Sequence, residues 1–271
     1  MRCKRSHDLA LEAGVIDEQT IESIAAFATA LDKMSSPSLP LWFRGVRHAY
    51  YDLSPTLYRR SDLTKFAEFS ALEQRLLTEF KHRSPPFVGK IPTDELELLF
   101  LMQHHSVPTR LLDWTENPFV ALFFALEAVR LPETQTDAAV WILNPLLLNK
   151  LSLSSYTHEG ILSVGDDLLR GYEPMKEPRT PATNPIALYG VHNSQRIVAQ
   201  RGVFVLSAMN TTPLNKIDFT DAGKGLLRKM TIPVANKKPI FDQLFAMGIT
   251  DSVLFPDLDG LAREIKTRHG F

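Results

Sequence analysis

Cysteine is almost absent from this sequence, since Cys3 is the single one among 271 residues. A lone cysteine excludes an internal disulfide and a zinc site built from cysteines, and it is typical of a reducing compartment. Long apolar runs are absent too, because the most hydrophobic stretch, 119–129, is too short to cross a bilayer and contains Glu127. No apolar segment follows the basic N-terminus, so we expect no signal peptide. These absences predict a soluble, cytoplasmic protein with no membrane partner.

An excess of charge of one sign is also missing, with 30 basic and 31 acidic residues and a net charge of -1. The balance gives no electrostatic case for bulk binding to nucleic acid or to a membrane surface, although it is compatible with a local basic patch. The sequence has no repeats, no low-complexity segment and no glycine-rich phosphate loop. A chain that is 44% hydrophobic and of this length can bury a large core.

Apolar patterning predicts helices mainly in the first half of the chain and strands mainly in the second. Helical spacing or capping signals mark 17–31, 64–83, 95–105, 240–247 and 257–266. Short apolar runs mark strands at 41–46, 109–114, 138–143, 203–206, 226–234 and 252–255. The irregular spacing of the strands favours an α+β fold, with helices against a mixed or antiparallel sheet, over a regular βαβ repeat.

Composition predicts two parts of unequal size. Residues 1–35 form a helical appendage that ends in a breaker-rich link, and residues 36–271 form the main domain. Within the main domain, 146–191 contains prolines and small polar residues and predicts a long irregular insertion. Such insertions commonly line or cover a site.

The stretch 103–126 combines polar and apolar residues in an unusual order. Its first half carries Arg110 and Asp113, and its second half is too hydrophobic all round for a surface helix. We expect a buried strand that turns sharply into a buried helix, with Thr115 or Asn117 as N-cap and Pro118 as the first helical residue. Charges at the mouth of an apolar core are costly unless they are paired or bind something. A site is therefore expected here.

Several blocks of this sequence resemble the FRG domain, which has an aromatic-Arg-Gly signature. Together they span about 41–266. They are Phe43-Arg44-Gly45, Ser54-Pro55-Thr56-Leu57 with Arg59, Gln103-His104-His105 with Pro108 to Thr115 and Asn117-Pro118, then Arg196, Gln200, Gly202 and Phe204, and finally Leu254-Phe255-Pro256-Asp257.

The FRG pattern is in turn similar to the ADP-ribosyltransferase superfamily. That similarity implies a split sheet and NAD as a substrate. Arg44 corresponds to the basic residue of its first core strand, and Asp113 to Thr115 leading into 120–125 corresponds to its strand-to-helix element. The chain departs from the pattern at Gln200, where the superfamily has a glutamate that steadies the oxocarbenium-like centre. A glutamine can hydrogen-bond a ribose hydroxyl but supplies no charge.

The resemblance implies an NAD-binding cleft between two small sheets. The implied catalytic residues are Arg44, Asp113, Gln200 and His104, with Asp113 the first choice for the missing acid. The implied NAD-binding residues are Arg44, Tyr51, Arg59, Arg110, Trp114, Thr115 and Asn117. Arg44 and Arg110 suit phosphate, Thr115 and the helix N-terminus at Asn117 suit an anionic or ribose oxygen, and Tyr51 or Trp114 suit a ring. The alternative is an internal network in which Arg110 pairs with Asp113 and His104 is a core histidine.

Two classes of function remain open. FRG domains occur in bacterial and phage contexts tied to defence and toxicity. One reading is therefore an ADP-ribosyltransferase-like toxin or defence effector, acting on a nucleic acid or a protein, with an antitoxin as a further partner. The other is a non-catalytic module that binds a nucleotide or a partner. A metal site is not expected, because His104 and His105 point about 100° apart on a helix and no third ligand stands at the right spacing.

Overall fold

Eight strands form one mixed sheet in the computed structural model, which describes residues 16–34, 39–130, 135–156, 158–174, 182–191 and 194–271. The strand order is β1-β8-β4-β2-β3-β7-β6-β5. β1 is parallel to β8 and β5 to β6, and the other neighbours are antiparallel. The strands are β1 (Asp17–Thr20), β2 (Trp42–Val46), β3 (Leu111–Thr115), β4 (Ala138–Leu143), β5 (Leu162–Ser163), β6 (Ile186–Tyr189), β7 (Gly202–Leu206) and β8 (Leu227–Ile232).

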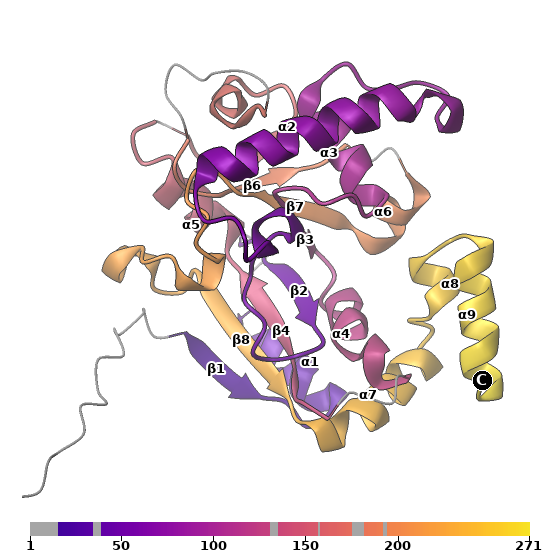
Figure 1. The fold of residues 1–271 in the computed structure, drawn as a ribbon. Coiled ribbons are helices and arrows are strands. Elements are labelled where there is room, and N and C mark those ends of the chain that lie inside the picture. Colours follow the sequence, from indigo (N-terminus) through magenta and orange to yellow (C-terminus); the bar gives the residue numbers. More distant parts are fainter. Residues whose placement is uncertain (1–15, 35–38, 131–134, 157, 175–181, 192–193) are drawn as a thin grey trace, which may run out of the picture.

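Helices cover the sheet and confirm the α+β class. In Figure 1, α2 and α3 lie beside the half of the sheet that contains β3, β6 and β7, and α1, α4 and α7 lie beside the half that contains β2, β4 and β8. The α-helices are α1 (Ile24–Met34), α2 (Phe66–Arg83), α3 (Glu95–His104), α4 (Pro118–Leu126), α5 (Pro145–Ser152), α6 (Gln195–Gln200), α7 (Val234–Ala246), α8 (Asp251–Leu254) and α9 (Leu258–His269).

The junction between β2 and β3 is weak, and we call it the seam. Its register contains one residue pair, Phe43 with Thr115, whereas β2 pairs with β4 at five positions and β3 with β7 at five. The sheet therefore consists of two four-stranded halves that share almost no backbone hydrogen bonding. The expected pair of separate small sheets is not confirmed, because the strand order runs through the seam.

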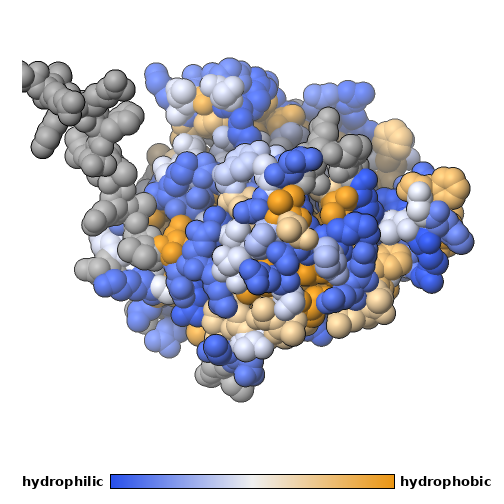
Figure 2. Space-filling view, turned by 90° about the horizontal axis from the view of Figure 1, so that it is seen from below, coloured by the Kyte–Doolittle hydropathy of each residue, from blue (hydrophilic) through white to orange (hydrophobic). Residues whose placement is uncertain are grey.

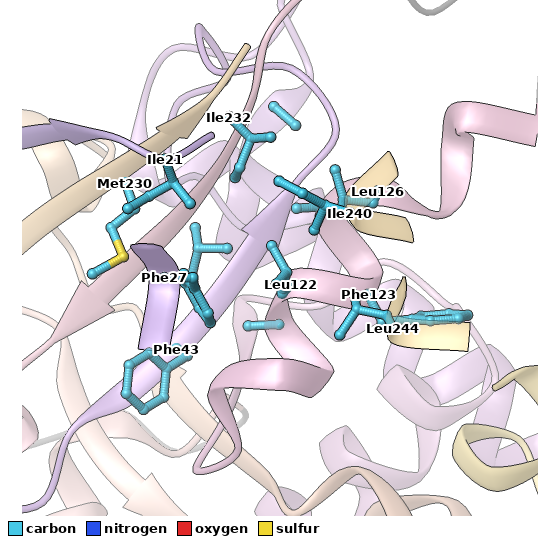
Figure 3. Packing of buried hydrophobic residues seen from close by; sticks show 14 of the residues in the cluster. Ile21, Phe27, Phe43, Leu122, Phe123, Leu126, Met230, Ile232, Ile240 and Leu244 are labelled. Atoms are coloured by element: carbon cyan, nitrogen blue, oxygen red, sulfur yellow. The ribbon is translucent and has the colours of Figure 1, made fainter. Parts of the chain in front are cut away.

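Three clusters of buried hydrophobic residues hold the layers together. The first joins α1, α4 and α7 to one half of the sheet, and Figure 3 shows Phe43 of β2, Leu122 of α4 and Ile240 of α7 within it. The second joins α2 and α3 to the other half. The third crosses the seam on the opposite face of the sheet, since it contains Trp42 from one half and Trp114 from the other. Side chains thus connect the two halves where the backbone does not.

Two predicted elements are wrong. The helix expected from residue 17 begins at Ile24, and Asp17–Thr20 is an exposed edge strand beside β8. Those four residues carry no apolar signal, so pairing at the sheet edge decides their conformation. The strand expected at 252–255 is the helix α8, because the side chain of Asp251 is buried against Arg130 and the backbone turns there. A short apolar run does not distinguish a strand from a helix.

The described part of the segment 146–191 is more ordered than its composition suggests, and residues 157 and 175–181 of the predicted insertion lie outside the described residues. It contains most of α5, β5 and the buried strand β6, which pairs with β7. The domain boundary at residue 36 stays a prediction. Ile24 and Phe27, which precede it, share the first cluster with Phe43, which follows it.

The surface seen from below is mainly hydrophilic, and hydrophobic residues gather on it in small groups (Figure 2). Within the described ranges, no helix combines the length and the apolar character needed to cross a membrane.

Candidate functional site

A cavity of about 980 Å³ lies along the seam. Its walls come from β2 and the turn after it, from η1 (Thr56–Arg59), from the C-terminal end of α3, from β3 and α4, and from α6 and β7. This volume is at the upper end of the range of about 300–1,000 Å³ that is usual for small-molecule sites. None of the described residues of 146–191 lies in its wall. The described part of the insertion that was expected to line or cover a site therefore does not line this one.

The Phe-Arg-Gly segment of β2 places an arginine at the seam. Phe43 is buried in the first cluster, and a Cβ atom on Gly45 would lie 1.9 Å from the carbonyl oxygen of Ala121 in α4. Gly45 is thus required for the close packing of α4 on β2. These two neighbours fix the strand, and Arg44 between them lines the cavity.

Arg44 bridges the seam with its side chain. Its Nη1 donates to the backbone carbonyl of Asp113 in β3, beyond the single β2–β3 pair. Burial lowers the pKa of Arg44, the carboxylate of Asp113 raises it again, and the positive charge of Arg59 lowers it. Arginine remains charged under such shifts. No carboxylate forms an ion pair with Arg44 among the described residues.

Asp113 is exposed at the cavity wall and is held by a short chain of hydrogen bonds. Gln103 Nε2 donates to its Oδ2 at 2.7 Å, and Thr109 Oγ1 donates to Gln103 Oε1 at 2.6 Å. Thr109 is fully buried, so the chain starts from a fixed point. Gln103 therefore orients the carboxylate of Asp113, and one carboxylate oxygen is left for a ligand.

Arginines are in excess in the cavity wall. Four arginines and three acids of the described residues line it, and Asp52, one of the acids, already pairs with Lys216 at 2.7 Å. The arginines are Arg44, Arg47, Arg59 and Arg196, and the other acids are Asp113 and Glu127. Burial raises the pKa of Glu127, while Arg130 and Arg47 oppose the shift. The cavity is suited to an anionic ligand.

Gln200 lies at the cavity wall, but its side chain has a structural partner. The side-chain Nε2 donates to the backbone carbonyl of Leu254 at 3.0 Å. The backbone carbonyl of Gln200 accepts from Thr115 Oγ1 at 2.6 Å. The neighbouring Arg196 stacks on Phe255, with its guanidinium carbon 4.8 Å from the ring centre. The sequence blocks around residues 200 and 255 therefore meet beside the cavity.

His104, Tyr51 and Arg59 also line the cavity. Burial lowers the pKa of His104, and the charges of His105 and Arg196 lower it further, so its ring is neutral near pH 7. Tyr51 is 41% exposed. Arg59 donates to the carbonyl of Ser54 at 3.0 and 2.9 Å, which directs its guanidinium without neutralising it.

A comparison with protein families shows which family the residues around this cavity match. The FRG domain model matches residues 40–134. The chain contains an FRG domain. The match includes Arg44, Arg59, His104 and Asp113, so one continuous FRG stretch supplies most of the cavity. The curated proteins give no match, and neither do the solved structures.

Two of the predicted ligand residues of the FRG domain have side chains that are engaged inside the protein. Arg110 is buried and forms an ion pair with Glu73 of α2, with an Nη2–Oε2 distance of 2.5 Å. It therefore pairs inside the protein, as the alternative reading held, but its partner is not Asp113. Trp114 belongs to the cavity wall, but it packs in the third cluster and is 3% exposed, so its ring is not available for stacking on a ligand.

Thr115 and Asn117 form the turn that follows β3 in the FRG domain. The Thr115 hydroxyl accepts from Asn117 N at 3.0 Å and donates to Gln200, so its proton is already used. Asn117 is the N-cap of α4, because its side chain accepts from Phe119 N at 3.0 Å, and Pro118 is the first helical residue. Thr115 lies in the cavity wall and Asn117 does not.

Sequence reasoning missed several residues of the FRG cavity. Glu127 was seen only as the charge that interrupts an apolar run, although a carboxylate beside buried phenylalanines is itself a signal of function. Gln103 was part of the recognised block but received no role. Arg47 gave no local signal, because an exposed arginine after a strand is common. Among the described residues, no group of three or more His, Cys, Asp or Glu side chains is arranged to hold a metal ion.

Proposed function

We propose that this FRG domain binds NAD in the cavity along the seam and transfers ADP-ribose to an acceptor, in a bacterial or phage defence or toxin role. The observation that carries the proposal is the pair Arg44 and Arg59. Both guanidiniums line the cavity, their charges repel, and neither has a carboxylate partner in an ion pair among the described residues. A pyrophosphate placed between them would supply the missing negative charge.

The chemistry needs an acid near the ribose, and Asp113 is the candidate. The bond between the nicotinamide nitrogen and C1 of the ribose breaks, and its electron pair leaves with nicotinamide. The acceptor forms the new bond at C1 and loses a proton. Asp113 would stabilise the positive charge at C1, because Gln103 fixes its carboxylate at the cavity wall. His104, which also lines the cavity and is neutral near pH 7, would take the proton.

The second candidate function is a module that binds the nucleotide without turnover. It is favoured by Gln200, whose amide group is engaged with Leu254 at the place where the transferase pattern has an acid. Binding and turnover are separate measurements, so the two functions are distinguishable.

The test measures NAD binding by calorimetry and nicotinamide release by chromatography. Arg44→Ala is expected to weaken binding about 10- to 100-fold, as for the loss of a charged hydrogen bond. Asp113→Asn keeps the shape and the hydrogen bond from Gln103, and it is expected to lower turnover about 100-fold or more with little change in affinity. Arg60→Ala is the matched control, because Arg60 pairs with Asp62 at the surface and does not line the cavity.

Three outcomes separate the readings. Nicotinamide release that both Arg44→Ala and Asp113→Asn reduce supports the transferase. Binding that depends on Arg44 without any release supports the module. Neither binding nor release in the folded wild-type protein would remove NAD from the site.

A further inference from the structure

Three aromatic rings cluster at the rim of the cavity, in the turn that follows β2. We call His48, Tyr50 and Tyr51 the aromatic platform. The rings of His48 and Tyr50 are stacked with centroids 5.3 Å apart at an angle of 28°. Tyr51 meets both rings edge-on, at 4.7 and 5.2 Å. The cluster is arranged as an ordered surface, and hydrophobic burial does not explain it, because Tyr50 is 68% exposed.

The platform is anchored from below. Ala49 N donates to the carbonyl of Asp137 at 2.7 Å, and His48 Nδ1 lies 2.5 Å from Thr136 Oγ1. The fully buried Lys237 donates to the carbonyl of Thr136 at 3.1 Å. Burial lowers the pKa of His48, and the charges of Lys237 and Arg47 lower it further. The ring that supports Tyr50 is therefore neutral and held in place.

The charges around the platform favour an anion. Arg47 is exposed, directly precedes the platform and lines the cavity, as Tyr51 does. Of the described acids near the platform, Glu127 interacts electrostatically with Arg47, and the other two already have partners in the protein. Asp52 pairs with Lys216 at 2.7 Å, and Asp137 Oδ1 accepts from Val234 N at 2.9 Å. A ligand would meet aromatic faces beside Arg47, which forms no ion pair with a carboxylate among the described residues.

We propose that the aromatic platform binds an unpaired base of a single-stranded nucleic acid, with a neighbouring phosphate on Arg47. Exposed aromatic rings next to basic residues are the usual means by which proteins hold single strands, because every base has a face that can stack. A duplex keeps its bases stacked inside and cannot offer one to Tyr50. The balanced net charge agrees with a local contact and excludes one that relies on the charge of the whole molecule.

The test measures the anisotropy of labelled 12-nucleotide RNA and DNA single strands of mixed sequence, with the full chain and without NAD. Tyr50→Ala and Tyr51→Ala are each expected to weaken binding about 5- to 100-fold, the effect of losing one stacked base. Tyr50→Phe keeps the ring and is expected to bind like the wild type. Tyr156→Ala is the control, because Tyr156 is also exposed, at 51%, but lies outside the platform.

Salt and strandedness complete the test. Arg47→Ala is expected to reduce the slope of log affinity against log salt by about 0.7, as for one phosphate contact on a single strand. Equal binding of a duplex with the same sequence would overturn the proposal, as would unchanged binding in Tyr50→Ala and Tyr51→Ala. Absence of oligonucleotide binding, with a protein partner lost in Tyr50→Ala, would assign the platform to protein recognition and overturn it too. Because NAD is absent from the assay, failure of the transferase reaction leaves this result unaffected.

Discussion

At the scale of single residues, Gln200 shows why a position in a pattern does not define a role. The transferase pattern has an acid there, but the amide Nε2 of Gln200 donates to the carbonyl of Leu254. A carboxylate cannot donate, and it would face the carbonyl oxygen. The glutamine therefore connects α6 to the start of the C-terminal helices, whatever it contributes to a ligand.

Gln200→Glu is accordingly expected to lower the free energy of unfolding by about 1–2 kcal/mol at pH 7, the cost of losing a partly buried hydrogen bond. Urea denaturation followed by circular dichroism measures the change. Gln195→Glu is the control, because Gln195 is exposed in the first turn of the same helix. Equal stability of the two variants would show that the contact with Leu254 contributes nothing.

The sequence was informative about residues that the FRG blocks bring into one site. Arg44 and Asp113 were expected together although they are 69 residues apart, and the structure connects them by a hydrogen bond. Arg110 belongs to the same block as Asp113 and was assigned to the site, but its partner is Glu73 of α2, which lies in none of the recognised blocks. A buried charge reveals that it needs a partner but not which one. The face of the sheet on which Trp114 lies depends on the register of β3, and the sequence did not predict it.

At the scale of elements, the contact between β2 and α4 determines the shape of the cavity. The contact depends on Gly45, because a Cβ atom there would lie 1.9 Å from the carbonyl of Ala121 and 2.5 Å from the amide of Ala125. Both are backbone atoms of α4, so no side chain can rotate to relieve the clash. The helix would have to move away from the strand.

Gly45→Ala is therefore expected to destabilise the protein by about 1–3 kcal/mol, as for overpacking of a dense core. The substitution should also weaken the binding of any ligand in the cavity, because Arg44 is the adjacent residue. Thermal unfolding and NAD binding are the two measurements. Gly89→Ala is the matched control, because no atom lies within 4 Å of its added Cβ. Similar melting temperatures for both variants would contradict the packing argument.

Elements with a strong apolar period or clear caps were predictable, and elements defined by their neighbours were not. Asn117 caps α4 as expected, and Asp94 caps α3, the helix that a capping signal predicted over 95–105. The strand Asp17–Thr20 has no buried residue and exists because β8 offers an edge. α8 resembles a strand in sequence and is set by the burial of Asp251. Tertiary contacts decided both cases.

At the scale of the whole molecule, the C-terminal helices depend on a network of charges. α8 and α9 lie at one side of the sheet (Figure 1). Glu264 of α9 accepts from the backbone amide of Ser252 at 3.2 Å and from its hydroxyl, and pairs with Arg268 at 2.7 Å. The hydrogen bonds from Ser252 and Thr250 are the main causes that lower the pKa of Glu264 to about 2.

A carboxylate with a lowered pKa stabilises the fold in its ionised form. The contribution of Glu264 is complete above its ordinary pKa of 4.5 and disappears as the pH falls from there towards about 2. Glu264→Gln is thus expected to lower the melting temperature at pH 7 and to show a flatter decline between these pH values. Melting curves across this pH range measure it, with the exposed Glu79→Gln as control. Parallel profiles for wild type and Glu264→Gln would refute the assignment.

The seam implies that ligand binding in the cavity affects the rigidity of the sheet. One rung of the ladder crosses from β2 to β3, and beyond it a single guanidinium spans the gap. A ligand that contacts Arg44 in one half of the sheet and Asp113 in the other would connect the two halves. Ligand binding and a loss of flexibility at the seam would then be coupled. Backbone amide protons in both halves of the sheet should gain protection from hydrogen exchange in proportion to the fraction of protein that has ligand bound.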